Sequence, residues 1–75
     1  MNEKEIIRAA MSEGGVTQKE LAEALKLSGQ QAVGNMLSRK NSMRLDNFVK
    51  MLDAMGYAVV VKKKIGASDE WKVDM

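Results

Sequence analysis

The sequence predicts a mainly α protein of four helices followed by a short C-terminal β-strand or hairpin. Apolar residues recur at helical spacing in four stretches between residues 2 and 56. Gly14, Gly15 and Gly56 stand where two of these stretches end, as expected of residues that stop helices. After Gly56 the pattern changes to a short β-branched run that favours a strand.

The first and last predicted helices are packing elements. The helix over residues 2–13 carries an apolar face of Ile6, Ile7, Ala10 and Met11. The helix over residues 45–56 carries the stripe Leu45, Phe48, Val49, Leu52 and Met55. We expect Phe48 to anchor the core, and Met36, Met51 and Met55 to fill or cover it.

The second predicted helix begins with a marked cap. Thr17 can accept from the backbone, and Glu20 stands three residues later, where a capping-box carboxylate belongs. The small Ala22 permits a close crossing with the next helix. In the connection that follows, Leu27 can reach the core, and we expect Ser28 to cap the third helix.

The third helix, which follows the expected cap Ser28, is predicted to present an amide-rich outer face. It buries Ala32, Val33, Met36 and Leu37, and its outer positions are Gln30, Gln31, Gly34, Asn35 and Ser38. Side-chain amides donate and accept at once, which matches the N6 donor and N7 acceptor of adenine in the major groove. The pattern favours base reading over the competing interpretation of an ordinary solvated face.

The region around this helix is basic although the whole chain carries only +2. Between residues 26 and 50 there are five Lys and Arg residues against one carboxylate, a net charge of +4. Residues 39–44 follow the third helix directly and would lie beside a phosphate strand if that helix entered the groove. The alternative is a solvated loop.

Residues 3–56, approximately, resemble the lambda repressor and Cro family of helix-turn-helix proteins, which are also called Xre-like. The matching features are Thr17 with Gln18, Leu21 with Ala22, Leu25 with Leu27, Val33, and the helix over residues 45–56. The segment from Ala22 to Val33 departs from the family pattern by one additional residue, and Lys26 replaces the usual turn glycine.

This resemblance implies a four-helix DNA-binding domain over residues 1–56, with its motif at residues 17–38. The sequence contains no cofactor-binding motif, so we expect no cofactor. The resemblance also implies that Gln18 braces the phosphate backbone and the recognition helix. The expected base-reading residues are Ser28, Gln30, Gln31 and Asn35. The expected contacts to the DNA backbone are Thr17, Gln18, Lys19, Ser38, Arg39, Lys40, Asn41 and Arg44.

Residues 57–75 are expected to form a separate extension. Residues 57–61 and 70–74 read as strands around a turn-like segment at residues 66–69. One interpretation is pairing with a second copy, through Tyr57, Val59, Val60, Val61 and Trp71. The other is a hairpin packed on the first and last helices, with Trp71 covering the core. Lys62, Lys63 and Lys64 fit either DNA contact or protection of a strand edge.

Composition limits the function classes. The 75 residues suffice for one small domain, and the absence of Cys excludes disulfides and zinc fingers. With no His or Cys, and with Glu20, Glu23, Asp46 and Asp53 in no catalytic spacing, we expect no enzyme. We expect a cytoplasmic protein with no membrane segment, because no long apolar run or signal peptide is present.

The sequence therefore predicts a small homodimeric transcriptional repressor that reads a palindromic operator in double-stranded DNA with residues 28–38. No small-molecule ligand is evident. The alternative is a protein-interaction module, of antitoxin or anti-repressor type, on the same scaffold.

Overall fold

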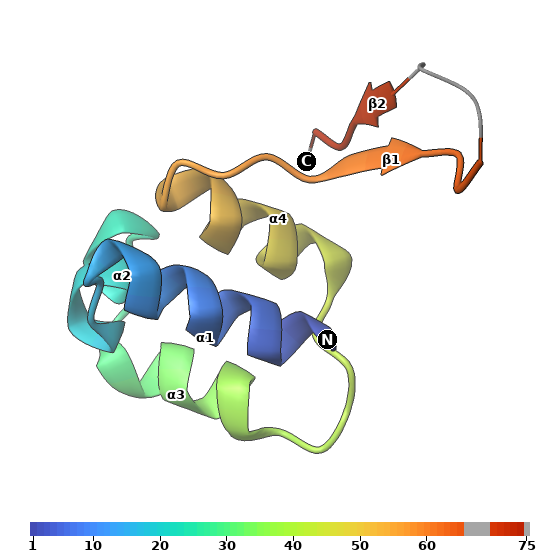
Figure 1. The fold of residues 1–75 in the computed structure, drawn as a ribbon. Helices are drawn as coiled ribbons and strands as arrows, with labels where there is room; N and C mark the ends of the chain where they lie inside the picture. The colour runs from blue at the N-terminus through green and yellow to red at the C-terminus, as the bar shows by residue number, and fades with distance from the viewer. Residues whose placement is uncertain (66–69, 75) are drawn as a thin grey trace.

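The computed structural model describes residues 1–65 and 70–74. In this part of the chain, four α-helices precede a two-stranded antiparallel hairpin (Figure 1). The elements are α1 Glu3–Gly14, α2 Gln18–Ala24, α3 Gln30–Ser38, α4 Leu45–Ala54, β1 Val60–Lys62 and β2 Glu70–Lys72. The predicted fold class, mainly α with a C-terminal hairpin, is confirmed at this level. No helix in the described residues is long and apolar enough to cross a membrane.

The ends of α1 and the start of α2 follow the local signals of the sequence. The Asn2 side chain accepts a hydrogen bond from the Glu5 backbone N–H at 2.9 Å, and Gly15 ends α1 with φ 65°. At α2 the Thr17 hydroxyl accepts from the Glu20 N–H at 3.1 Å, and the Glu20 carboxylate accepts from the Thr17 N–H at 3.1 Å. The predicted capping box is present.

The connection between α2 and α3 differs from the prediction at one residue. Lys26 takes the left-handed conformation, with φ 57°, and so occupies a position that glycine usually fills. Ser28 does not cap α3, because Gly29 takes the N-cap position and no side chain caps the helix. Ser28 therefore lies one residue too early to reach the free N–H groups of the first turn.

The core lies where α1, α2, α3 and α4 meet. α2 packs on α3, and α4 packs on both α1 and α2. The most deeply buried large side chains are Ile7, Leu21, Val33 and Met51. Phe48, predicted to anchor the core, is only half-buried at its edge, because Met51 on α4 occupies the centre.

Within the described residues, the hairpin is attached to the helices at its base, where the Tyr57 N–H donates to the Leu52 carbonyl at 2.8 Å. Val59 is half-buried against the core, and its carbonyl accepts from the Val73 N–H at 2.7 Å. Farther along, Val61 pairs with Trp71, and both are exposed, at 53% and 62%. The prediction that Trp71 covers the core is therefore wrong: the register carries it past the helices. The predicted turn at residues 66–69 lies outside the described residues.

Candidate nucleic-acid interface

The outer face of α3 presents side-chain amides to solvent. Gln30, Gln31 and Asn35 are all exposed, while Val33 and Leu37 hold the opposite face in the core. Gln31 and Asn35 lie four residues apart, so their side chains share one side of the helix. The structure therefore leaves all three predicted amide side chains exposed, with Gln31 and Asn35 on one side of α3 and Gln30 at its first residue.

The side chain of Gln18 reaches this face from the start of α2. Its Oε1 atom lies 3.1 Å from the position that a Cβ atom would take on Gly34. Because Gly34 has no side chain, the Gln18 amide can lie directly against α3. Gly34 is next to Asn35 in the chain, so the Gln18 side chain lies beside the exposed part of α3.

The residues around the start of α3 line a cleft. Lys19 from α2 and Ser28, Gly29 and Gln30 contribute to its walls. Thr17 stands at the start of α2, where its oxygen accepts from the Glu20 N–H. The Thr17 hydroxyl proton is not used in that bond, so it can still donate to a phosphate oxygen.

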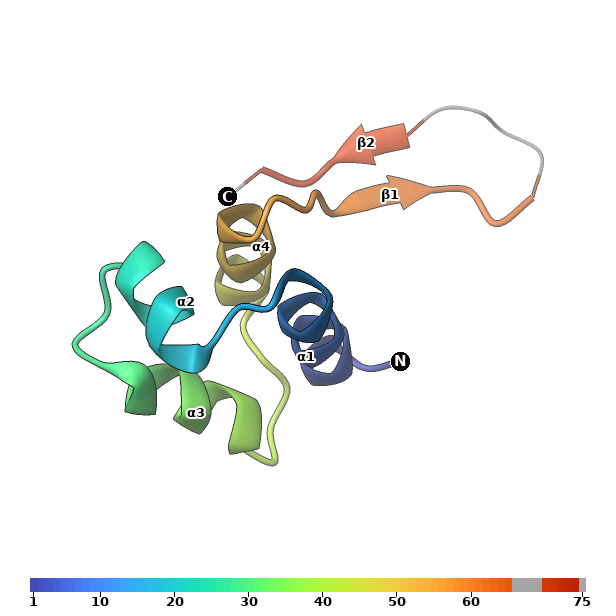
Figure 2. The same ribbon diagram turned by 60° about the vertical axis from the view of Figure 1, so that its left-hand side comes forward.

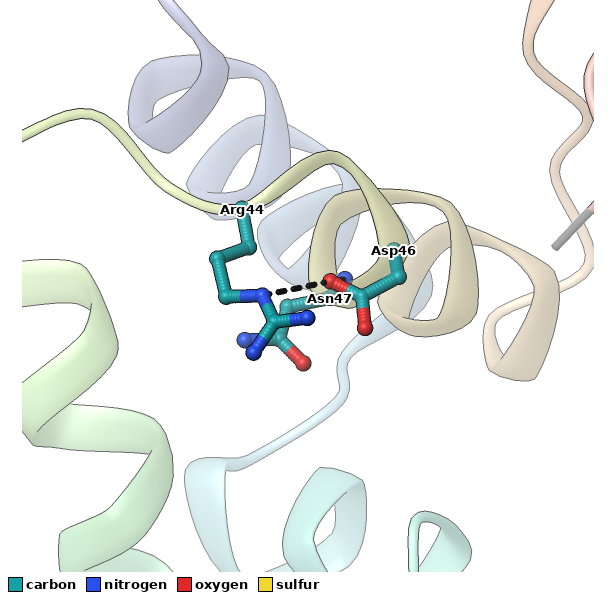
Figure 3. A network of polar contacts seen from close by, with 3 residues as sticks. All are labelled: Arg44, Asp46 and Asn47. Carbon is teal, nitrogen blue, oxygen red and sulfur yellow. Dashed lines mark hydrogen bonds and ion pairs between the residues drawn. The ribbon is translucent and has the colours of Figure 1, made fainter.

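The loop after α3, residues 39–44, will be called the exit loop. Its Arg39, Lys40 and Asn41 are exposed, and Ser38 just before it is exposed as well. Arg44, with a side chain 80% exposed, pairs with Asp46 through Nε and Oδ1 at 3.2 Å (Figure 3). A surface ion pair of this kind is weak, at about 0 to 1 kcal/mol. Arg44 can therefore turn to a phosphate at little cost.

A small depression adjoins the exit loop, and part of its lining was missed from the sequence. It lies between the end of α3 and the start of α4 and is lined by Met36, Arg39, Asn41, Ser42, Met43, Arg44 and Asn47. Asn47 lies in the same polar cluster as Arg44 and Asp46 (Figure 3). The signal for Asn47 in the sequence is a polar residue in the first turn of α4, a helix that its apolar stripe predicts as a packing element.

Two side chains of α1 also reach this region and were not predicted. The Arg8 guanidinium donates to the Leu37 carbonyl at 3.0 Å, and the Glu3 carboxylate accepts from the Met43 N–H at 3.0 Å. The bonds to the backbone of Glu3 and of Met43 lower the pKa of the Glu3 carboxyl below its ordinary value. Nothing in the local sequence of α1 indicates either contact.

The predicted dimerisation residues lie far from α3. In both views the hairpin stands on one side of α1 and α4, and α3 stands on the other (Figure 1 and Figure 2). Val60, Val61 and Trp71 are exposed, whereas Val59 is half-buried. Tyr57 lies at the base of the hairpin, where partial burial and the nearby Glu13 carboxylate raise the pKa of its hydroxyl.

Within the described residues, no three acidic side chains come together as they would around a metal ion. The arrangement instead joins an amide-bearing helix face to a cationic loop, which suits recognition of a polar, anionic polymer. No protein-family model matches the sequence, and no curated protein or solved structure matches it either.

Proposed function

We propose that the chain is a sequence-specific double-stranded DNA-binding regulator. In this proposal α2 and α3 form a helix-turn-helix of the lambda-repressor type, and α3 enters the major groove. One observation carries the proposal: the exposed amide face of α3 is followed directly by the cationic exit loop. Base-reading groups and phosphate-binding groups would thus meet the same stretch of duplex.

The amides of α3 supply the sequence preference. Gln30, Gln31 and Asn35 are exposed and each carries a donor and an acceptor on one planar group. Such a group bonds adenine at two points, and a good bidentate contact discriminates against the wrong base by about 1 to 3 kcal/mol. Ser28, beside the start of α3, is the fourth candidate for a base contact.

The cations and small polar groups around α3 supply most of the affinity. The proposed contacts to the DNA backbone are Thr17, Gln18, Lys19, Ser38, Arg39, Lys40, Asn41 and Arg44. All of them are exposed. Contacts to phosphates release counterions, so the affinity should fall with salt concentration for every DNA sequence.

The regulator is proposed to act as a homodimer. One recognition helix reads only a few base pairs, whereas two helices about 34 Å apart read both halves of a palindrome. The hairpin supports this proposal, because Val61 and Trp71 form an exposed apolar pair on an element that projects beyond the helices. Since occupation of a promoter needs no further domain, repression is the proposed outcome.

Selection of bound duplexes from a random DNA pool, at near-physiological salt, tests this function. Enrichment of a palindrome is the expected result. Replacing Gln31 by Ala should then relax the preference at one position, whereas Arg39→Ala should weaken all sequences alike and reduce the salt dependence. A pool without enrichment would contradict the proposal.

A second function, as a protein-interaction module, is favoured by one feature of the structure. The exposed Val61 and Trp71 belong to β1 and β2, which lie on the side of α1 and α4 opposite α3, and they could bind another protein without any DNA. A chain with Gln30, Gln31 and Asn35 all replaced by Ala separates the two functions. If that chain retained full regulatory activity, the interaction module would be the better description.

A further inference from the structure

We infer that α1 holds the exit loop in its DNA-binding shape, with Glu3 and Arg8 as positioning residues. Both side chains bond to the backbone around this loop rather than to each other. The inference rests on the proposed function, because it assigns the exit loop to the phosphate backbone. It adds a purpose for α1, which the sequence had identified only as a packing helix.

The first attachment is at the end of α3. The Arg8 guanidinium donates to the Leu37 carbonyl at 3.0 Å, two residues before the exit loop begins. Carbonyl groups in the last turn of a helix have no partner inside the helix and carry partial negative charge. A guanidinium there satisfies one carbonyl and its charge is favourable, so Arg8 fixes the point where α3 gives way to the loop.

The second attachment is near the other end of the loop. The Glu3 carboxylate accepts from the Met43 N–H at 3.0 Å, and the Met43 side chain is half-buried against the core. Glu3 and Arg8 lie on one helix, so the two bonds fix both ends of the exit loop to a single rigid element. Arg39, Lys40 and Asn41, between the two attachments, remain exposed.

The helices on either side bond to the loop at its two end residues: the Arg39 N–H donates to the Asn35 carbonyl at 3.1 Å, and the Arg44 side chain pairs with Asp46 at 3.2 Å. Arg39 leaves α3 in an extended conformation, and α4 has no side-chain cap at Arg44. A loop without internal caps would lose conformational freedom when it met DNA, and that loss would weaken binding. Attachment to α1 lowers this cost because the loop is ordered before DNA arrives.

The test compares loop motion in the free protein among matched variants. The measurement is the heteronuclear NOE of the backbone amides of residues 40–43, which reports motion on the picosecond to nanosecond scale. Glu3→Ala and Arg8→Ala should lower these NOE values. Glu5→Ala is the control, since Glu5 is exposed in the same first turn and carries the same charge. Glu3→Gln keeps an acceptor oxygen and should restore the wild-type values.

DNA affinity provides the second readout. Losing a negative charge alone should strengthen binding slightly in both Glu3→Ala and Glu5→Ala. In Glu3→Ala the loss of the hydrogen bond to Met43 should outweigh this small gain, so DNA affinity should fall about twofold to tenfold. Arg8→Ala should weaken binding with no change of salt slope, whereas a direct contact of Arg8 to a phosphate would lower that slope.

The outcomes separate this inference from the proposed function. Equal NOE values in Glu3→Ala and Glu5→Ala would overturn the role of Glu3, whether or not the chain binds DNA. Unchanged NOE values together with a lower salt slope in Arg8→Ala would make Arg8 a phosphate contact. A wild-type chain that binds no DNA would refute the proposed function, while the NOE comparison would still decide whether α1 orders the loop.

Discussion

The Gln18 side chain lies against Gly34, with its Oε1 atom 3.1 Å from the position of a Cβ atom on that glycine. This contact joins the first residue of α2 to the middle of the exposed face of α3. A side chain at residue 34 would compete with the Gln18 amide for the same space. The absence of a side chain there is thus part of how Gln18 reaches the candidate interface.

Gly34→Ala should therefore change stability and DNA binding in opposite directions. Alanine is favoured over glycine inside a helix by about 0.8 to 1 kcal/mol, and the exposed Gln18 side chain can move aside at little cost. We expect the free energy of unfolding in urea to rise and DNA affinity to fall. In a Gln18→Ala background the loss of affinity should disappear. A Gly34→Ala chain with unchanged affinity would contradict the role of the contact.

Lys26→Gly should stabilise the protein. Lys26 has φ 57°, and a residue with a Cβ atom pays roughly 1 kcal/mol for this left-handed conformation, which glycine adopts freely. We expect a gain of about 0.5 to 1 kcal/mol in urea unfolding. Lys26→Ala is the control, because it removes the same charge but keeps the strain. If both variants shifted the midpoint equally, the charge and not the backbone would be the cause.

Tyr57, the only tyrosine in the chain, should ionise at a higher pH than a free tyrosine. Partial burial of the hydroxyl is the larger cause and the nearby Glu13 carboxylate is the smaller one, and together they raise the pKa of Tyr57 above 10.0. The folded state then holds this proton more strongly than the unfolded state. The resulting stability is fully present below pH 10 and is lost as pH rises through the higher folded pKa.

An ultraviolet titration of Tyr57 in the folded protein measures this shift directly. Glu13→Gln should move the midpoint back toward that of free tyrosine, though not completely, because the partial burial remains. A midpoint that did not respond to this variant would show that Glu13 has no influence on the hydroxyl.

Trp71 provides a direct signal for self-association, because it is the only tryptophan and is 62% exposed. If two copies associate through the face that carries Val61 and Trp71, its emission should move to shorter wavelength as concentration rises. Val61→Thr should weaken this association, whereas Val60→Thr, on the opposite face of β1, should not. Sedimentation of each variant gives the oligomeric state. Equal effects of the two substitutions would favour pairing through the strand edge instead.

Features set by neighbouring residues could be predicted from the sequence. The capping box of Thr17 and Glu20 needs only a spacing of three, and the structure contains both of its bonds. Ser28 was misassigned because two adjacent residues, Ser28 and Gly29, were both acceptable caps. The two side chains do not show which residue is the N-cap of α3. The path of the backbone after Lys26 determines that it is Gly29.

Features that depend on the packing of distant segments could not be predicted. The hydrogen bond between Glu3 and Met43 joins residues 40 positions apart, and no repeating pattern in the sequence indicates it. The sequence predicts Phe48 as the anchor of the core and Met51 as a residue that fills or covers it, but it does not indicate which of the two reaches the centre. In the hairpin, alternation did not indicate where the helices end, so the sequence left two interpretations for Trp71, and the one that placed it on the core is wrong.

The hairpin and α3 lie on opposite sides of α1 and α4 (Figure 2). Substitutions on one element therefore touch no side chain of the other, and their energetic effects should add. Under the proposed function, a lineage carrying this fold could acquire a new target sequence through Gln31 or Asn35 while its assembly partner stayed the same. It could equally acquire a different protein partner through Val61 and Trp71 while it continued to bind the same DNA sequence.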